Sequence, residues 1–156
     1  MSTIAYRDGW LASDSGAWAG DSFFGDTQKI FLVPFGDEVA LMGLVGDLYA
    51  CIKFRLWFMN EYLPEGECIG EGDLKPEDPV EAIVIYPDGA VELWDSNLVP
   101  YYMKMDFYAL GNGRDFAIGA MEAGATAEQA IEAACKYDAH TQGPVTKINI
   151  WEVNNE

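Results

Sequence analysis

The sequence predicts an α+β fold in which two antiparallel sheets lie face to face and helices cover their outer surfaces, a four-layer αββα sandwich. Asp-Gly pairs at residues 8–9 and 88–89 each separate two short apolar runs, which is typical of β-hairpins. The expected strands come in such pairs and the helices in blocks, unlike the strict alternation of a parallel α/β fold. The length of 156 residues fits a single domain covering residues 1–156.

The first half of the chain is expected to contain two strand pairs. Residues 3–7 and 10–13 form the first hairpin, and the polar, glycine-containing segment 14–27 is expected to be a loop. Residues 28–33 and 39–45 form the second pair. The second of these strands is apolar throughout, which predicts burial on both of its faces.

A long helix is predicted over residues 47–63, with Asp47 placed to cap its first turn. It carries one apolar stripe at positions 48, 52, 56, 59 and 63, and a second apolar face at positions 54, 57 and 58. A helix that is apolar on two sides either is buried in a large core or lies at a subunit interface, and the sequence leaves both possibilities open.

The second half is expected to combine three strands with two helices and to close on a further strand. Thr126 and Gln129 form a capping box, and Gly124 ends the helix before it. In order, the elements are a loop at 64–79, strands at 82–86, 91–94 and 106–110, helices at 114–122 and 127–138, and a last strand at 145–153.

Composition excludes several classes of function. The chain has 26 acidic and 9 basic residues and a formal net charge of -17, so neither nucleic acid nor an anionic membrane is an expected partner. The excess of acidic residues has two possible roles. It either keeps the surface solvated, or it repels acidic partners or binds a basic one. No export leader or membrane-spanning run is recognisable. We therefore expect a cytoplasmic protein.

The cysteine and histidine content predicts neither a metal site nor a cofactor. Cys51, Cys68 and Cys135 form no CxxC motif and are expected to be reduced thiols. His140 is the single histidine, and no zinc-binding or Ser-His-Asp pattern surrounds it, so we expect a loop residue without a chemical role.

The first candidate for chemistry is Ser2. Removal of Met1 would leave a serine with both a hydroxyl and a free α-amine, whose unperturbed pKa is about 7.7–8.0. Such an amine can act as the general base for its own hydroxyl near neutral pH. The predicted strand that starts at residue 3 would hold this serine in a fixed place.

Ser2, Asp14 and Lys29 follow one another in an order that resembles the HslV-type and proteasome β-subunit peptidases, which are N-terminal nucleophile (Ntn) hydrolases. Members of that family begin with a nucleophilic threonine on the first strand, followed by an aspartate after the second strand and a lysine on the third. Here serine replaces the threonine and keeps the same oxygen chemistry.

Three further motifs extend the resemblance over nearly the whole chain. The run from Leu41 to Asp47 is similar to the family's glycine-rich junction between strand and helix. The run 109–113 resembles A-I-G-S-G, with asparagine at position 112 in place of serine. The run 138–143 resembles D-x-x-S-G-G, with Asp138 and Thr141 matching and glutamine departing from the pattern at position 142.

The resemblance implies a role for each matching residue. Lys29 would lower the pKa of the Ser2 hydroxyl or relay its proton, and Asp14 would keep Lys29 charged and oriented. A backbone N–H at Gly46 would bind the developing oxyanion. Asp138 and Thr141 would fix the α-amine by hydrogen bonds. Taken singly, the Asp14–Lys29 pair would also fit a surface ion pair, and the run 138–141 would fit a helix end and turn.

The function that the resemblance implies is hydrolysis of peptides or unfolded proteins by a peptidase subunit without a cofactor. Such a subunit would form a homo-oligomeric ring, with an ATP-dependent unfoldase as a candidate partner. A compact relative of this kind is expected in the cytoplasm of a bacterium or of a phage-infected host. Two alternatives stay open: a catalytically inactive scaffold or assembly protein, and an amidase that acts on a small molecule.

Overall fold

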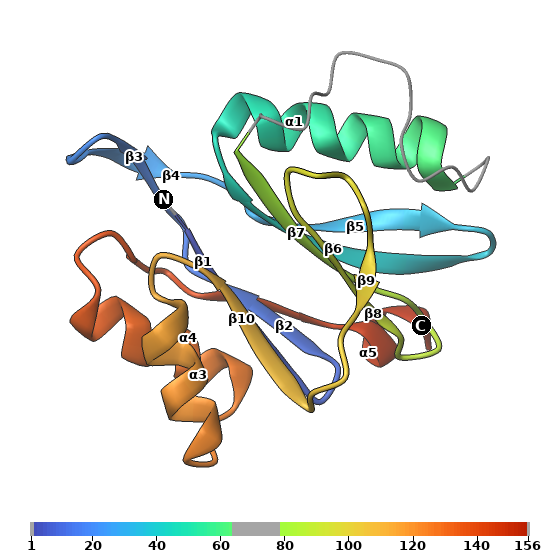
Figure 1. The fold of residues 1–156 in the computed structure, drawn as a ribbon. Helices are drawn as coiled ribbons and strands as arrows, with labels where there is room; N and C mark the ends of the chain where they lie inside the picture. Colours follow the sequence, from blue (N-terminus) through green and yellow to red (C-terminus); the bar gives the residue numbers. More distant parts are fainter. Residues whose placement is uncertain (1, 64–78, 156) are drawn as a thin grey trace.

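The computed structural model describes residues 2–63 and 79–155, and these form the predicted αββα sandwich (Figure 1). One antiparallel sheet has the strand order β10-β1-β2-β11 and the other the order β5-β6-β7-β8-β9. Helix α1 covers the outer face of the five-stranded sheet, and α3 with α4 covers the outer face of the four-stranded sheet.

The elements have the following bounds: β1 (Thr3–Arg7), β2 (Trp10–Ser13), β3 (Gly16–Ala19), β4 (Ser22–Asp26), β5 (Ile30–Phe35), β6 (Glu38–Gly46), α1 (Leu48–Trp57), η1 (Phe58–Tyr62), β7 (Val80–Ile85), β8 (Val91–Trp94), β9 (Tyr101–Tyr102), β10 (Phe107–Gly111), α3 (Arg114–Glu122), α4 (Ala127–Tyr137), β11 (Thr146–Asn149) and α5 (Ile150–Asn154).

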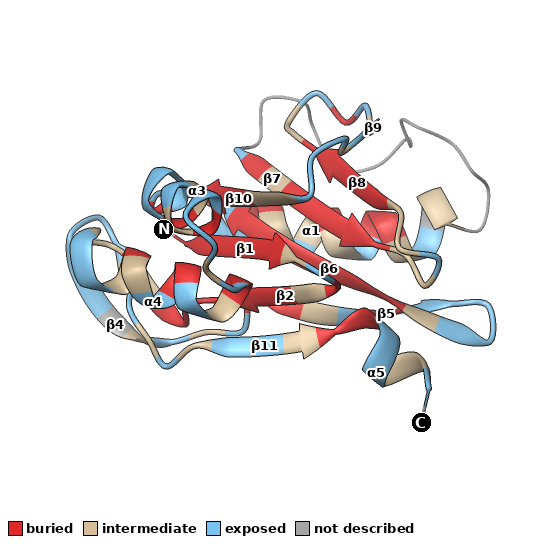
Figure 2. Ribbon diagram, turned by 90° about the horizontal axis from the view of Figure 1, so that it is seen from below, coloured by how far each residue is buried: buried red, intermediate tan, exposed pale blue. Residues whose placement is uncertain are grey.

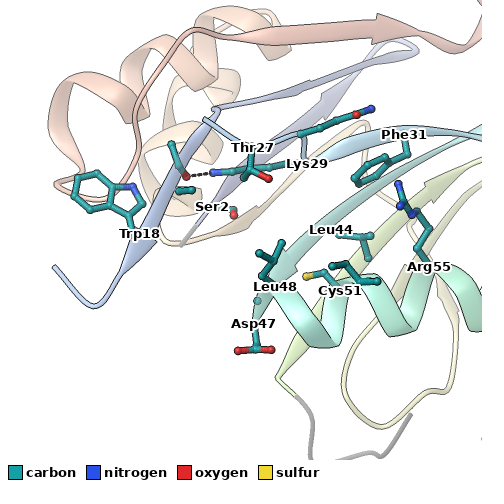
Figure 3. A pocket seen from close by; sticks show the side chains of 15 residues that line it. Ser2, Trp18, Thr27, Lys29, Phe31, Leu44, Asp47, Leu48, Cys51 and Arg55 are labelled. Carbon is teal, nitrogen blue, oxygen red and sulfur yellow. Dashed lines mark hydrogen bonds between the residues drawn. The ribbon is translucent and has the colours of Figure 1, made fainter. Parts of the chain in front are cut away.

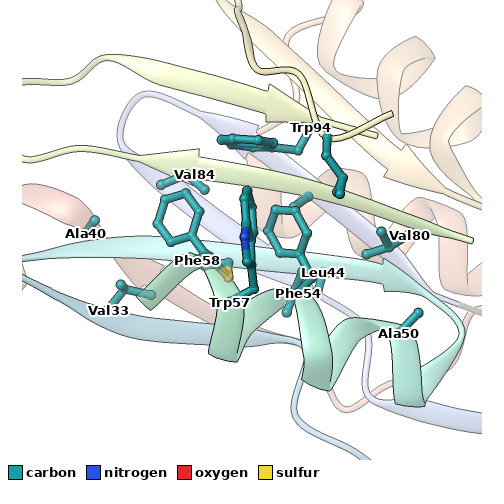
Figure 4. Packing of buried hydrophobic residues seen from close by; sticks show 13 residues of the cluster. Val33, Ala40, Leu44, Ala50, Phe54, Trp57, Phe58, Val80, Val84 and Trp94 are labelled. Carbon is teal, nitrogen blue, oxygen red and sulfur yellow. The ribbon is translucent and has the colours of Figure 1, made fainter. Parts of the chain in front are cut away.

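Three apolar clusters join the four layers. The first, between the two sheets, contains Ile4 and Leu11 from one sheet and Ile83 from the other. The second lies between the five-stranded sheet and α1, where the rings of Phe54 and Trp94 meet edge to face with centroids 5.6 Å apart (Figure 4). The third is built largely from alanines, so α3 and α4 approach the four-stranded sheet closely. Burial is therefore concentrated in the central strands (Figure 2).

Most of the predicted elements are confirmed. Asp8 and Gly9 both have positive φ angles, 52° and 80°, which is the geometry of a tight hairpin turn that matches the strand twist. The Thr126–Gln129 capping box is present with both of its hydrogen bonds. The Asp47 carboxylate accepts the amide N–H of Ala50 at 3.0 Å, as expected of an N-cap.

The structure contradicts two of the predicted elements. Residues 14–27 were expected to be a loop, but strands β3 and β4 form a hairpin there, stabilised by a contact between the Trp18 and Phe23 rings at 5.4 Å. Residues 145–153 were expected to be one strand, but the strand ends at Asn149. The Asn149 side chain accepts the N–H groups of residues 151 and 152 and so starts helix α5.

Helix α1 is shorter than predicted and continues as the π-helical turn η1. The face with Phe54 and Trp57 is buried against the sheet, whereas Leu48, Ile52 and Leu56 are 57%, 42% and 51% exposed. These three members of the predicted stripe are therefore not part of the core, whereas its last two members, Met59 and Leu63, pack against it. Cys68 and most of the predicted loop at 64–79 lie outside the described residues. Within the described part, no helix is long and apolar enough to cross a membrane.

Candidate active site

Ser2 lies at the start of β1, close to the β3–β4 hairpin and to the first turn of α1 (Figure 3). Its carbonyl oxygen accepts the amide N–H of Asn112 at 2.9 Å. Its side chain lies at the junction of two cavities, with volumes of about 310 Å³ and 680 Å³, and the residue is 8% exposed. Among the described residues the Ser2 hydroxyl has no hydrogen-bond partner, so it is free to face a ligand in either cavity.

A buried ion pair supports this end of β1. The Lys29 ammonium donates to Asp14 Oδ1 at 2.8 Å and to the carbonyl of Gly16 at 2.7 Å. The Asp14 side chain is fully buried and that of Lys29 is 3% exposed, which excludes the alternative of a surface pair. Asp14 also accepts the backbone N–H of Thr3 at 2.9 Å, so the carboxylate joins the lysine directly to the residue after Ser2.

Burial changes the pKa values of both partners. It lowers the pKa of the Lys29 ammonium, and the charge and hydrogen bond of Asp14 oppose this shift. It raises the pKa of the Asp14 carboxyl, and Lys29 with the N–H groups of Thr3 and Gln142 offsets part of that shift. A lysine with a lowered pKa beside a hydroxyl is suited to proton transfer.

A second hydrogen-bond chain reaches β1 from the segment after α4. Thr141 donates its hydroxyl proton to Asp138 Oδ2 at 2.6 Å, so the 2.7 Å contact between the Thr3 and Thr141 hydroxyls is donated by Thr3. Thr3 Oγ1 in turn accepts the backbone N–H of Gly113 at 2.9 Å. These hydrogen bonds fix the side chain of Thr3, the residue next to Ser2, while Asp14 binds its backbone N–H.

The loop after α4 also holds Asp14 and the β3–β4 hairpin. The backbone N–H of Gln142 donates to Asp14 Oδ2 at 3.2 Å, and its carbonyl accepts the N–H groups of Ser15 and Gly16. The departure from the family motif at this position therefore leaves these backbone contacts intact. His140 Nε2 lies 2.8 Å from Asp21 Oδ1 and links the loop to the hairpin tip rather than to Ser2.

Gly46 lines both cavities together with Ser2 and ends β6 with a φ of 130°. A Cβ at this position would overlap the carbonyl of Pro79, so only glycine fits here. The backbone at this junction is thus exposed to a ligand that contacts the serine.

The structure brings Ser2, Lys29 and Gly46 to one cavity, with Asp14 directly behind Lys29. The hydrogen bonds of the Thr141 side chain go to Thr3 and Asp138, and Asp138 Oδ2 also accepts the backbone N–H of His140 at 3.2 Å. Their predicted contact with an α-amine of Ser2 stays a prediction. Nowhere in residues 2–63 and 79–155 are three or more His, Cys, Asp or Glu residues grouped to hold a metal ion.

The sequence interpretation missed three contributors. Thr3 joins both hydrogen-bond networks, Gly16 accepts from Lys29 through its carbonyl, and Trp18 forms one wall of the smaller cavity. The last two belong to the unpredicted β3–β4 hairpin. Its signal was the pair Gly20-Asp21 between two aromatic-containing runs, which is a turn dipeptide.

Gly111→Ala is expected to displace Ser2 and to destabilise the chain by about 2 kcal/mol or more. Gly111 has a φ of 94°, and an added Cβ would overlap the Ser2 carbonyl oxygen. Urea unfolding measures the effect. Gly119→Ala in α3 is the control, because nothing lies within 4 Å of its added Cβ, and it should stabilise the helix by about 0.5–1 kcal/mol. Equal stabilities of the two variants would contradict the close approach of β10 to Ser2.

The thiol of Cys51, which lines the smaller cavity, is expected to alkylate slowly at neutral pH. Burial, with a smaller contribution from Asp47, raises its pKa to about 11. Iodoacetamide should therefore react roughly 100-fold more slowly at pH 8 than with a free thiol, and the rate should still rise at pH 9.5. Peptide mass spectrometry resolved at Cys51 measures this rate. A plateau below pH 9 would show instead a reactive thiolate that competes with Ser2 as the nucleophile.

Solved structures with this fold align over nearly the whole chain. Thiobacillus denitrificans BPH has a TM-score of 0.65 and 18% identity, covering 96% of this chain and 97% of its own. BPH in complex with epoxomicin has a TM-score of 0.66 and 16% identity, covering 96% and 98%. Eukaryotic HslV from Trypanosoma brucei has a TM-score of 0.68 and 15% identity, covering 95% and 98%. No family model matches the sequence. No curated protein matches it either.

The resemblance predicted from the sequence is confirmed at the level of the fold. The TM-scores of 0.65 to 0.68 over 95–96% of the chain show that the shared fold includes nearly all of it. The chain thus has the αββα Ntn-hydrolase fold of HslV and related proteasome-like proteins.

Proposed function

We propose that this chain is a subunit of a proteasome-like peptidase, with Ser2 as the nucleophile once Met1 has been removed. The observation that carries the proposal is that Ser2 opens onto two cavities while the buried Lys29–Asp14 pair supports its strand. Nothing else in the described fold combines a free hydroxyl, a buried lysine and an accessible glycine backbone in one cavity.

The proposed reaction begins with the α-amine of Ser2 taking the hydroxyl proton while Oγ attacks the peptide carbonyl carbon. The positive charge of Lys29 favours the deprotonated hydroxyl, and the Gly46 N–H stabilises the oxyanion of the tetrahedral intermediate. The protonated amine then gives its proton to the leaving nitrogen, and the C–N bond breaks to form a serine ester. Water attacks this ester and the amine accepts the proton of the water. The bond between the acyl carbon and Oγ then breaks, the amine returns the proton to Oγ, and the carboxylic acid product leaves.

Assembly into a homo-oligomeric ring is part of the proposal. The apolar side chains that α1 exposes outside the cavity of Ser2, those of Tyr49 and Leu56, would be covered by contacts between copies. An ATP-dependent unfoldase could deliver unfolded chains to such a ring in the bacterial cytoplasm or in a phage-infected host. Native mass spectrometry is expected to show a closed oligomer, and a monomer at micromolar concentration would argue against this part.

The test of the function compares protein that begins at Ser2 with protein that retains Met1. Fluorogenic peptide amides should be hydrolysed only by the first, because Met1 turns the catalytic amine into an amide. Equal hydrolysis by both would exclude the amine as the base. The substrate panel should also contain small-molecule amides, since turnover of those alone would favour the amidase. If neither protein hydrolyses any of these substrates and both form an intact oligomer, the result would favour the catalytically inactive scaffold.

A further inference from the structure

The smaller cavity is a groove between α1 and the segment from β3 to β5 (Figure 3). Helix α1 contributes Leu48, Cys51, Ile52 and Arg55, whose spacing of three and four residues places them on one face. Ser2 and Trp18 lie toward one end of the groove, and Phe31 with Arg55 lies at the other. The groove is therefore apolar along the helix and ends in a cation.

Arg55 is the cation of this groove that has no carboxylate partner. Its guanidinium carbon lies 4.0 Å from the centroid of the Phe31 ring. In the described part of the chain no acidic group lies within ion-pair distance of it, although the protein has 26 acidic and 9 basic residues. Lys29, the other cation that lines the groove, is paired with Asp14.

The contact with Phe31 leaves the guanidinium ready for a ligand. The face of an aromatic ring attracts the guanidinium charge but is not a carboxylate, so N–H donors of Arg55 stay available. Those donors match the two oxygens of a carboxylate. The groove residues thus offer an apolar surface near Ser2 and an anion-binding group away from it.

We propose that this groove selects polypeptides with apolar side chains near the cleaved bond and an Asp or Glu carboxylate about three residues away, bound by Arg55. In the proposed binding mode the substrate lies extended along α1 with its cleaved bond beside Leu48, and this sets the spacing. Leu48 and Arg55 are seven positions apart, which is about 10 Å along a helix, and an extended peptide covers that length in about three residues. This inference rests on the proposed function, because it assigns that site a substrate class.

The test is a glutamate scan of an apolar fluorogenic peptide, in which each position up to four residues from the cleaved bond carries Glu or Gln. With wild-type protein, one position about three residues away should favour Glu over Gln by about tenfold in kcat/KM. Arg55→Gln should abolish that preference. Lys53→Gln is the matched control, because it removes the same charge from the same helix. Lys53 lies over the Tyr49 ring and does not line the groove.

Three results of the scan would overturn the inference. The first is a Glu preference that Arg55→Gln leaves unchanged, and the second is the absence of any preference in wild-type protein. The third is equal loss in Arg55→Gln and Lys53→Gln, which would show a long-range effect of charge rather than a binding site.

Fluorescence polarisation with the Ser2→Ala variant and the same labelled peptides separates this inference from the proposed function. Preferential binding of the Glu peptide that requires Arg55, without hydrolysis by wild-type protein, would support the groove and overturn the peptidase. Hydrolysis without the preference would overturn the groove and support the peptidase. Neither binding nor hydrolysis would overturn both.

Discussion

Ser2→Ala is expected to lower kcat for peptide hydrolysis by at least about 1,000-fold, because the variant lacks the oxygen that attacks the carbonyl. The fold should be unaffected. The contacts of Ser2 within the described chain use its backbone, including the carbonyl that accepts from Asn112, and alanine preserves them. Hydrolysis of a fluorogenic peptide, measured with the midpoint of thermal unfolding, checks both statements.

Two companion variants make this result specific. Ser22→Ala makes the same chemical change at an exposed site on β4 and should retain full activity. Ser2→Thr keeps a hydroxyl at the reacting position and should retain measurable activity. Undiminished hydrolysis by Ser2→Ala would remove Ser2 from the mechanism altogether.

Lys29→Met is expected to destabilise the chain by about 3–5 kcal/mol, since it leaves the Asp14 carboxylate buried without a counter-charge. Solvent does not screen this ion pair, because the Lys29 and Asp14 side chains are 3% and 0% exposed. The same variant should lose peptidase activity, as Lys29 lies in the cavity with Ser2. Urea unfolding and hydrolysis of the same peptide measure the two effects.

The control for the ion pair is Lys147→Met. Lys147 pairs with Glu128 near the surface, where the two side chains are 46% and 38% exposed, so its loss should cost less than about 1 kcal/mol. The double variant Lys29→Met/Asp14→Asn should recover part of the stability, because it removes the buried negative charge. A cost for Lys29→Met no greater than that for Lys147→Met would contradict the role of the pair.

The fold could be predicted wherever local chemistry and the tertiary structure agree. In the Asp8-Gly9 turn and the Thr126–Gln129 capping box, neighbouring residues determine the local conformation, and both features are present. The segment 14–27 was mispredicted because its polar residues and glycines resemble a loop, while its pairing depends on the Trp18–Phe23 contact. The end of the chain was mispredicted because Asn149 caps a helix inside a run that alternates like a strand.

The candidate site shows a similar division. Motif order predicted Ser2, Asp14 and Lys29 as site residues, and the structure places the last two in contact and all three around one end of β1. It could not identify Thr3, because a hydroxyl on a strand takes its role from partners more than 100 residues away in the sequence, such as Thr141 and Gly113. Hydrogen bonds from backbone N–H groups, such as that from Gln142 to Asp14, cannot be predicted from residue type, because every residue except proline has this group.

The most direct test of the central claim is the intact mass of the purified protein before and after incubation with a β-lactone, an electrophile that acylates a hydroxyl nucleophile. We expect a chain lighter by one methionine residue, which gains one stoichiometric adduct located on Ser2 by peptide mapping. Ser2→Ala should remain unlabelled under the same conditions. A chain that keeps Met1 and stays unmodified would contradict the assignment of Ser2 as an N-terminal nucleophile.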